Sequence, residues 1–244
     1  MSTAASPFPD YVRSPNITDR PEVYERENEA ILADGRLWAA MRKRADWAGR
    51  TVLDLGCGTG FWLAHYRRQA ERTIGVEPEP RLRSLAAERV AGVPGIEVLA
   101  GSAEHIPLPD ATVDVVHARF VYFFPPGVEA GLAEVMRVLR PGGTLVVVDN
   151  DLTWGQFAGL VGRSPWAAAQ GDHATTTRWW VEHGGQRSVV RAAWKCQSAA
   201  ELQDILRIEL PRELVELWTR RHASAKSLSY GYALYAAHRE LALL

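Results

Sequence analysis

The chain has 244 residues, of which 47% are hydrophobic and 23% charged, a composition typical of one folded globular domain. Its 28 basic and 29 acidic side chains give a formal net charge of -1, so no overall positive field is available to hold a nucleic acid. No stretch approaches the roughly 18 uninterrupted apolar residues of a membrane span, and the opening residues lack the basic and apolar regions of a secretion signal. We therefore expect a cytoplasmic protein with neither a nucleic-acid nor a membrane partner.

Four prolines punctuate the polar opening segment 7–21, a pattern typical of an extended arm. Two short helices are predicted to follow, at about 22–32 and 35–46. We expect residues 1–47 to form part of a lid over a larger domain, 48–244.

From residue 51 onward, short apolar runs alternate with amphipathic segments. Strands are predicted at 51–55, 73–77, 96–100, 113–117 and 143–149, and helices at 61–68, 81–90 and 128–139. Continuous apolar strands separated by helices indicate a parallel sheet with helices on both faces. In the last third, strands are predicted at 187–196 and 227–237, and helices begin near 198 and 211.

A glycine-rich turn directly follows the first predicted strand, in the sequence VLDLGCGTG that ends at Gly60. Because glycine has no Cβ and accepts positive φ, such a turn lets a ligand approach the backbone closely. Glu77 ends the next strand about 20 residues after Gly56, where a carboxylate can accept hydrogen bonds from both ribose hydroxyls. The two features predict a nucleoside site.

The spacing of the glycines distinguishes between two classes of nucleoside-binding site. A dinucleotide site would have the spacing GxGxxG, whereas Gly56, Gly58 and Gly60 alternate strictly. Asp54 stands just before the loop, where an acid repels pyrophosphate but accepts hydrogen bonds from an ammonium group. The pattern favours an amine-bearing ligand over NAD.

Four motifs follow one another along the chain: DLGCGTG, Glu77, GSAEHIPLPDATVDVV and LRPGGTLVVVD. In this order they resemble the class I S-adenosylmethionine-dependent methyltransferases, especially the small-molecule, quinone-biosynthesis-like group known as type 11. The resemblance covers about residues 48–150. It implies a Rossmann-like α/β fold with a seven-stranded, mostly parallel sheet whose last strand is antiparallel. It also implies S-adenosylmethionine as cofactor and S-adenosylhomocysteine as product.

The resemblance assigns parts of the cofactor to parts of the chain: the methionine end to the glycine loop, the ribose to Glu77 and the adenine to 102–104. The expected cofactor contacts are Asp54, Gly56, Cys57, Gly58, Gly60, Glu77, Pro78, Ser102, Ala103, Glu104, Arg119, Phe120 and Tyr24. Ser102 departs from the family pattern, since an acid there commonly receives the adenine amino group. Adenine recognition is therefore expected to depend on the backbone of Ala103. We expect Cys57 to pack in the loop without reacting.

One position in the sequence argues against a metal site. Metal-dependent catechol-type methyltransferases resemble the pattern at Asp149 and Asn150 and add another acid after the fourth strand. Arg119 stands where that acid would be, and a guanidinium repels a divalent cation. The sequence predicts no metal.

His173 is the predicted general base if the acceptor is a hydroxyl, because the pKa of histidine lies near neutral pH. It belongs to the tryptophan-rich segment 152–185, which is expected to form an acceptor pocket after the fifth strand. His117, in the fourth strand, is the second candidate.

The sequence thus predicts methyl transfer to oxygen, nitrogen or carbon of a small molecule, in secondary or specialised metabolism. One alternative is a cofactor-binding scaffold of the same fold that has lost methyl transfer or catalyses another reaction. An NAD-dependent oxidoreductase is a further alternative.

Overall fold

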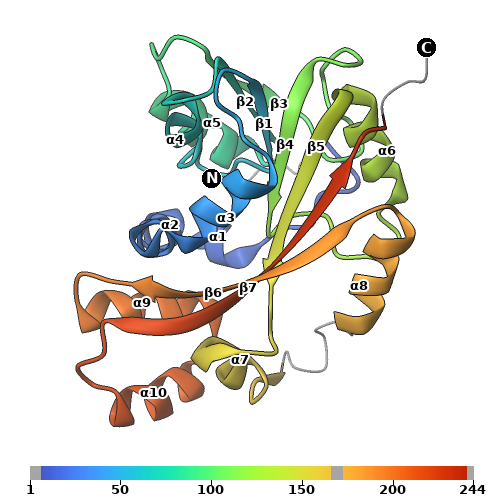
Figure 1. The fold of residues 1–244 in the computed structure, drawn as a ribbon. Coiled ribbons are helices and arrows are strands. Elements are labelled where there is room, and N and C mark those ends of the chain that lie inside the picture. The colour runs from blue at the N-terminus through green and yellow to red at the C-terminus, as the bar shows by residue number, and fades with distance from the viewer. Residues whose placement is uncertain (1–6, 166–172, 241–244) are drawn as a thin grey trace.

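A computed structural model describes residues 7–165 and 173–240 of the chain (Figure 1). The strands of the described part form a seven-stranded sheet in the order β3-β2-β1-β4-β5-β7-β6. The strands are β1 Thr51–Leu55, β2 Arg72–Glu77, β3 Ile96–Ala100, β4 Val113–Arg119, β5 Leu139–Asn150, β6 Gln186–Lys195 and β7 Ser227–His238. Strands β1 to β5 pair in parallel, whereas β7 is antiparallel to both β5 and β6. The expected mostly parallel sheet with an antiparallel last strand is confirmed.

Helices cover the sheet on both faces (Figure 1). The helices are α1 Pro15–Asp19, α2 Pro21–Asp34, α3 Arg36–Arg44, α4 Leu63–Arg67, α5 Pro80–Arg89, α6 Glu129–Val138, α7 Gly155–Val161, α8 His173–Glu182, α9 Ala199–Glu209 and α10 Arg212–Arg221. Neighbouring strand residues point to opposite faces. Val52 and Val115 therefore belong to the core under α2, α3, α7, α9 and α10, and Leu53 and Val116 to the core under α6 and α8.

Two boundaries differ from the expectations. Strand β4 continues through Arg119, because it stays paired with β5 up to Val148, so Arg119 ends the strand instead of following it. Strand β5 begins at Leu139 and includes Pro141–Gly143, where its register against β4 shifts and Gly142 has φ of 80°. Its backbone is held by Arg239, which accepts from the Gly142 N–H and donates to the Gly143 carbonyl.

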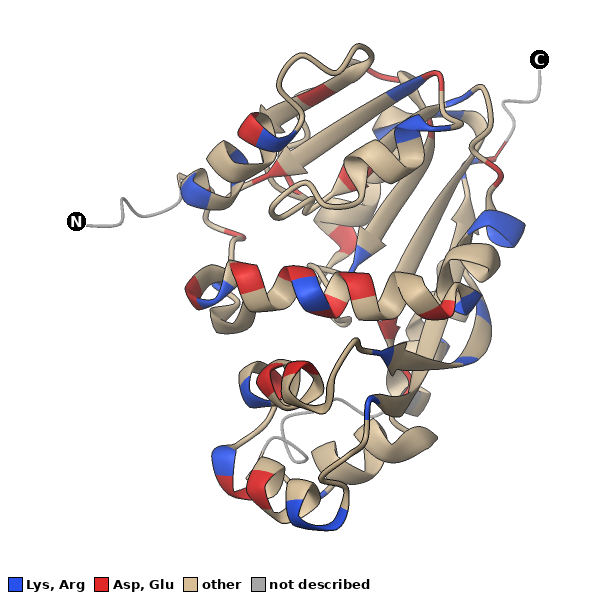
Figure 2. Cartoon of the chain, turned by 90° about the vertical axis from the view of Figure 1, so that its left-hand side faces the viewer, with Lys and Arg blue, Asp and Glu red and all other residues tan. Residues whose placement is uncertain are grey.

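The N-terminal region contains the two expected helices, preceded by the short α1. Pro21 occupies the first turn of α2, and Gly35, with φ of 73°, separates α2 from α3. Acidic and basic residues are interspersed along the helices on the side shown in Figure 2. Within the described residues, no helix is both long and apolar enough to cross a membrane.

Candidate active site

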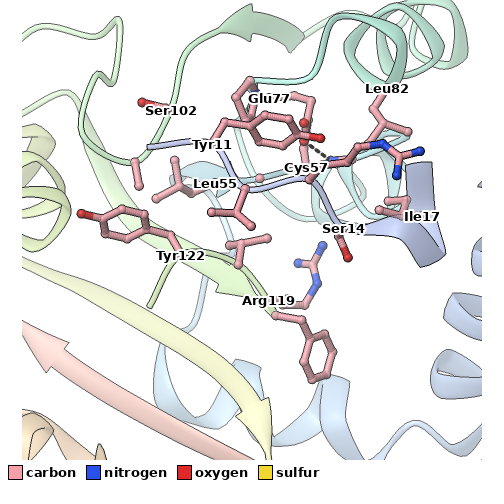
Figure 3. A pocket seen from close by; sticks show the side chains of 18 of the residues that line it. Tyr11, Ser14, Ile17, Leu55, Cys57, Glu77, Leu82, Ser102, Arg119 and Tyr122 are labelled. Atoms are coloured by element: carbon pink, nitrogen blue, oxygen red, sulfur yellow. Dashed lines mark hydrogen bonds between the residues drawn. The ribbon is translucent and has the colours of Figure 1, made fainter. Parts of the chain in front are cut away.

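A cavity of about 680 Å³ lies at the carboxyl ends of the first four strands. Residues that end or follow β1, β2, β3 and β4 form one side, and residues 10–17 together with α2 form the other. The carboxyl edge is where open α/β sheets bind ligands, because the loops after parallel strands gather there. Figure 3 shows the N-terminal segment crossing this cavity, with Tyr11 beside Glu77 and Ile17 near Cys57.

The glycine loop brings bare backbone to the cavity wall. Gly56 and Gly58 have φ of 70° and 56°, a conformation that other residues rarely adopt. A Cβ on Gly58 would lie 2.7 Å from Cδ1 of Ile17, so that glycine allows the N-terminal segment to close over the loop. The backbone N–H groups of Gly56 and Cys57 both donate to the carbonyl of Val76, which fixes the loop against β2.

Glu77 is a buried carboxylate held by backbone. It accepts hydrogen bonds from the N–H of Gly58 at 2.8 Å and from the N–H of Glu79 at 2.9 Å. Its side chain lies on the cavity wall, and each oxygen keeps a further lone pair for a ligand hydroxyl. Burial raises the pKa of Glu77 to about 7, although the two backbone N–H groups oppose the shift.

Asp54 and Arg119 form a buried ion pair next to the loop. Nη2 of Arg119 lies 3.1 Å from Oδ2 of Asp54, and the two side chains are 8% and 1% exposed. The guanidinium also lies over the ring of Trp62, 4.8 Å from its centroid, and donates to the hydroxyl of Tyr66. Burial raises the pKa of the Asp54 carboxyl, and the charge of Arg119 opposes that shift. Arg119 thus presents a fixed positive charge to the cavity.

The opposite end of the cavity is formed by the residues after β3. The hydroxyl of Ser102 lies 3.5 Å from Nδ1 of His105, and the carboxylate of Glu104 accepts from the hydroxyl of Tyr122 at 2.7 Å. The backbone N–H of Glu104 donates to Oδ2 of Asp10 at 3.3 Å. This end therefore joins the β3 loop to the N-terminal segment.

The structure brings most of the sequence-predicted contacts together. The cavity wall includes Tyr24, Gly56, Cys57, Gly58, Glu77, Pro78, Ser102, Ala103, Glu104, Arg119 and Phe120. Two of the expected contacts are not on that wall: Asp54 faces Arg119, and Gly60 lies against Ala86 of α5. Burial raises the pKa of the Cys57 thiol well above its usual range, so it packs as a neutral group.

Segment 152–185 contributes no residue to the cavity wall in the part of it that the structure describes. His173 is the first residue of α8, and its side chain, like all of Trp166, lies outside the described residues. The indole of Trp179 donates to Glu129 of α6, and Trp180 is buried against Phe123, so these rings pack the core.

The other candidate base, His117, is buried in the core. Its ring stacks on Tyr66 and meets Trp47 edge-on, and burial holds its pKa well below the usual range, so it is neutral. It is not among the residues that line the cavity.

Many cavity residues were missed by the sequence reasoning, among them Asp10, Asn28 and Trp62. The indole N–H of Trp62 donates to Oδ1 of Asn28 at 3.0 Å, which ties the helix after the glycine loop to α2. Trp62 directly follows the loop and could have been suspected on that ground. Asp10 and Asn28 reach the site only through tertiary contacts.

Comparisons with known proteins agree with this geometry. A family model described as a methyltransferase domain matches residues 53–147. The demethylmenaquinone methyltransferase of Thermobifida fusca is 35% identical over 171 residues, which is 64% of this chain and 69% of that protein. The chain belongs to the class I S-adenosylmethionine-dependent methyltransferases.

Other relatives of this methyltransferase match over shorter stretches. The malonyl-[acyl-carrier protein] O-methyltransferase of Serratia marcescens is 35% identical over 40% of this chain and 37% of its own length. The chain likewise spans about half the length of an uncharacterized methyltransferase of Mycobacterium sp. (strain KMS), to which it is 38% identical. A methyltransferase structure from Aquifex aeolicus has a TM-score of 0.60 at 19% identity and covers 89% of this chain and 97% of its own. At that identity, the likeness shows the fold.

Proposed function

We propose that this methyltransferase moves the methyl group of S-adenosylmethionine to an oxygen, nitrogen or carbon of a small molecule in specialised metabolism. The observation that carries the proposal is the cavity in which Glu77 is held beside bare loop backbone at Gly58. These residues fit a nucleoside, because the carboxylate has free lone pairs for hydroxyls and stands beside loop backbone that carries no side chain at Gly58. When bound, the cofactor supplies a methyl group already activated on a sulfonium.

The residues of the chain then have to bind the cofactor, orient it toward the acceptor and exclude water. Glu77 would accept from the ribose hydroxyls, and Ser102 and Ala103 would contact the adenine. Arg119, fixed by Asp54, would face the charged amino-acid end. The arm and α2, which form the other side of the cavity, would act as a lid and keep the reacting atoms dry.

The acceptor pocket is proposed to include segment 152–185, within a catalytic domain that spans 48–244. The role of His173 as general base and the cytoplasmic location both stay predictions.

The proposed reaction is tested by incubating the protein with methyl-labelled S-adenosylmethionine and a panel of phenols, amines, carboxylic acids and activated carbon acids. Label transferred to any acceptor supports it. Cofactor binding with no transfer across the panel would favour the alternative, a protein of the same fold that carries out another reaction.

Cofactor binding is expected to depend on pH through Glu77. Its pKa of about 7 makes the carboxyl largely neutral below that pH, and ribose hydroxyls bind best to the ionised form. The affinity for S-adenosylhomocysteine should therefore rise as the pH increases from about 5.5 to 8 and then level off. Calorimetry at a series of pH values checks this, with Glu77→Gln as the control whose profile should be flat. A wild-type affinity that is constant or falls over this range would contradict the role given to Glu77.

Methyl transfer is expected to need no divalent metal. Arg119 points a guanidinium into the cavity where a metal-binding acid would be required, and like charges repel. Enzyme treated with EDTA should keep its rate of label transfer. Loss of activity that magnesium restores would refute this prediction and would make Asp149 and Asn150 candidate ligands.

A further inference from the structure

The N-terminal segment follows the whole length of the cavity. In Figure 3 it runs from the side of Ser102, past Glu77 at Tyr11, to Ile17 beside the glycine loop. Its far end is anchored, since Nη1 of Arg81 donates to the carbonyl of Thr18 at 3.1 Å. The segment therefore lies along the ligand site in a fixed register.

At the end of the cavity near β3, the polar side chains that follow the strand have neighbours within the loop and β4 region. The hydroxyl of Ser102 is directed to His105, and the carboxylate of Glu104 is held by Tyr122. Ser102 carries no charge, and one oxygen of Glu104 is turned to Tyr122, so Asp10 is the further carboxylate at this end of the cavity.

Asp10 differs from these neighbours. Oδ2 accepts from the backbone N–H of Glu104, which fixes the carboxylate against the β3 loop. Oδ1 is buried and has no hydrogen-bond partner among the described residues, although Asp10 lines the cavity. A buried carboxylate oxygen without a donor is unfavourable, so its position indicates a donor supplied by a ligand.

We propose that Asp10 accepts a hydrogen bond from the exocyclic amino group of adenine. The N-terminal arm, residues 10–17, thereby takes part in recognition of the base. The inference rests on the proposed function, which puts the ribose at Glu77 and hence the base toward Ser102. The arm thereby supplies, from the other side of the cavity, the carboxylate that position 102 lacks.

This arrangement couples recognition to closure. The Asp10 side chain reaches the base only when the arm lies across the cavity, so a ligand with a 6-amino group stabilises the closed arm. A ligand with a 6-oxo group presents an acceptor to the Asp10 carboxylate, and two acceptors repel each other. Asp10 therefore discriminates adenine from hypoxanthine.

Calorimetric titration with S-adenosylhomocysteine and S-inosylhomocysteine tests the proposal, because the two ligands differ at this group. The wild type should prefer the adenosyl compound by at least about tenfold. Asp10→Asn should reduce that preference by at least about tenfold, since the amide can donate to a 6-oxo group and loses the charge that favours an amino group. Asp10→Ala, which removes the carboxylate without adding a donor, should also reduce it.

Asp19→Asn is the matched control, because Asp19 lies on the same segment but is exposed and pairs with Arg13. Its preference should equal that of the wild type. If the Asp10 variants weaken both ligands by the same factor, Asp10 has only a structural role and the proposal is overturned. Discrimination that is absent in the wild type would also overturn it, whereas failure of the wild type to bind S-adenosylhomocysteine at all would refute the proposed function itself.

Discussion

Replacing Glu77 with alanine is expected to weaken S-adenosylhomocysteine binding by at least about tenfold. The carboxylate is fixed by Gly58 and Glu79 with free lone pairs toward the cavity, so the ribose meets a preorganised acceptor. Hydrogen bonds to a charged group contribute roughly 1.5 to 3 kcal/mol each, and about 1.4 kcal/mol corresponds to a factor of ten in affinity. Isothermal titration calorimetry measures the change directly.

Glu88→Ala is the control for this variant, because Glu88 is exposed on α5 and should leave the affinity unchanged. Thermal unfolding of Glu77→Ala should be recorded alongside, since the same carboxylate also holds the glycine loop. Unchanged affinity in a folded Glu77→Ala variant would remove Glu77 from the ribose site.

Replacing Arg119 with methionine is expected to lower the free energy of unfolding by about 3 to 5 kcal/mol. The change leaves Asp54 buried without its partner, and breaking a buried ion pair from one side has a cost of this order. The loss of stability is large because Oδ1 of Asp54 already lacks a hydrogen-bond partner among the described residues. Without Arg119 the Asp54 carboxylate would keep none. Urea denaturation followed by tryptophan fluorescence measures the loss.

The double variant Asp54→Asn, Arg119→Met separates this explanation from simple loss of packing. Removing the orphaned charge should recover a large part of the lost stability, whereas lost contacts of the guanidinium with Trp62 would not be recovered. A double variant no more stable than Arg119→Met would contradict the view that Asp54 and Arg119 act as a pair.

The parallel strands of the sheet and the cofactor loop could be predicted because their signals are local. The run of apolar residues through Leu55, the alternating glycines and the acid at Glu77 all act within a few residues or one βαβ unit. The structure places Glu77 and the loop in direct contact through the N–H of Gly58. Backbone conformation and strand pairing force that contact, so a short pattern suffices to indicate it.

The side of the cavity formed by the N-terminal arm could be predicted only in outline. Prolines indicated an extended arm, but nothing near Asp10 in the sequence indicates that its carboxylate meets Glu104, which lies 94 positions away. The tryptophans of 152–185 could not be assigned from the sequence for a related reason. Large apolar rings suit a ligand pocket and a core equally, and Trp180 is completely buried in the core under α6 and α8.

The most direct test of the account is a calorimetric titration of the purified wild-type protein with S-adenosylhomocysteine, and in parallel with NADH. The cavity, with Glu77 beside the glycine loop and Arg119 at one end, predicts saturable binding of one S-adenosylhomocysteine per chain and no binding of NADH. No heat of binding with S-adenosylhomocysteine, or saturable binding of NADH at the same site, would contradict it.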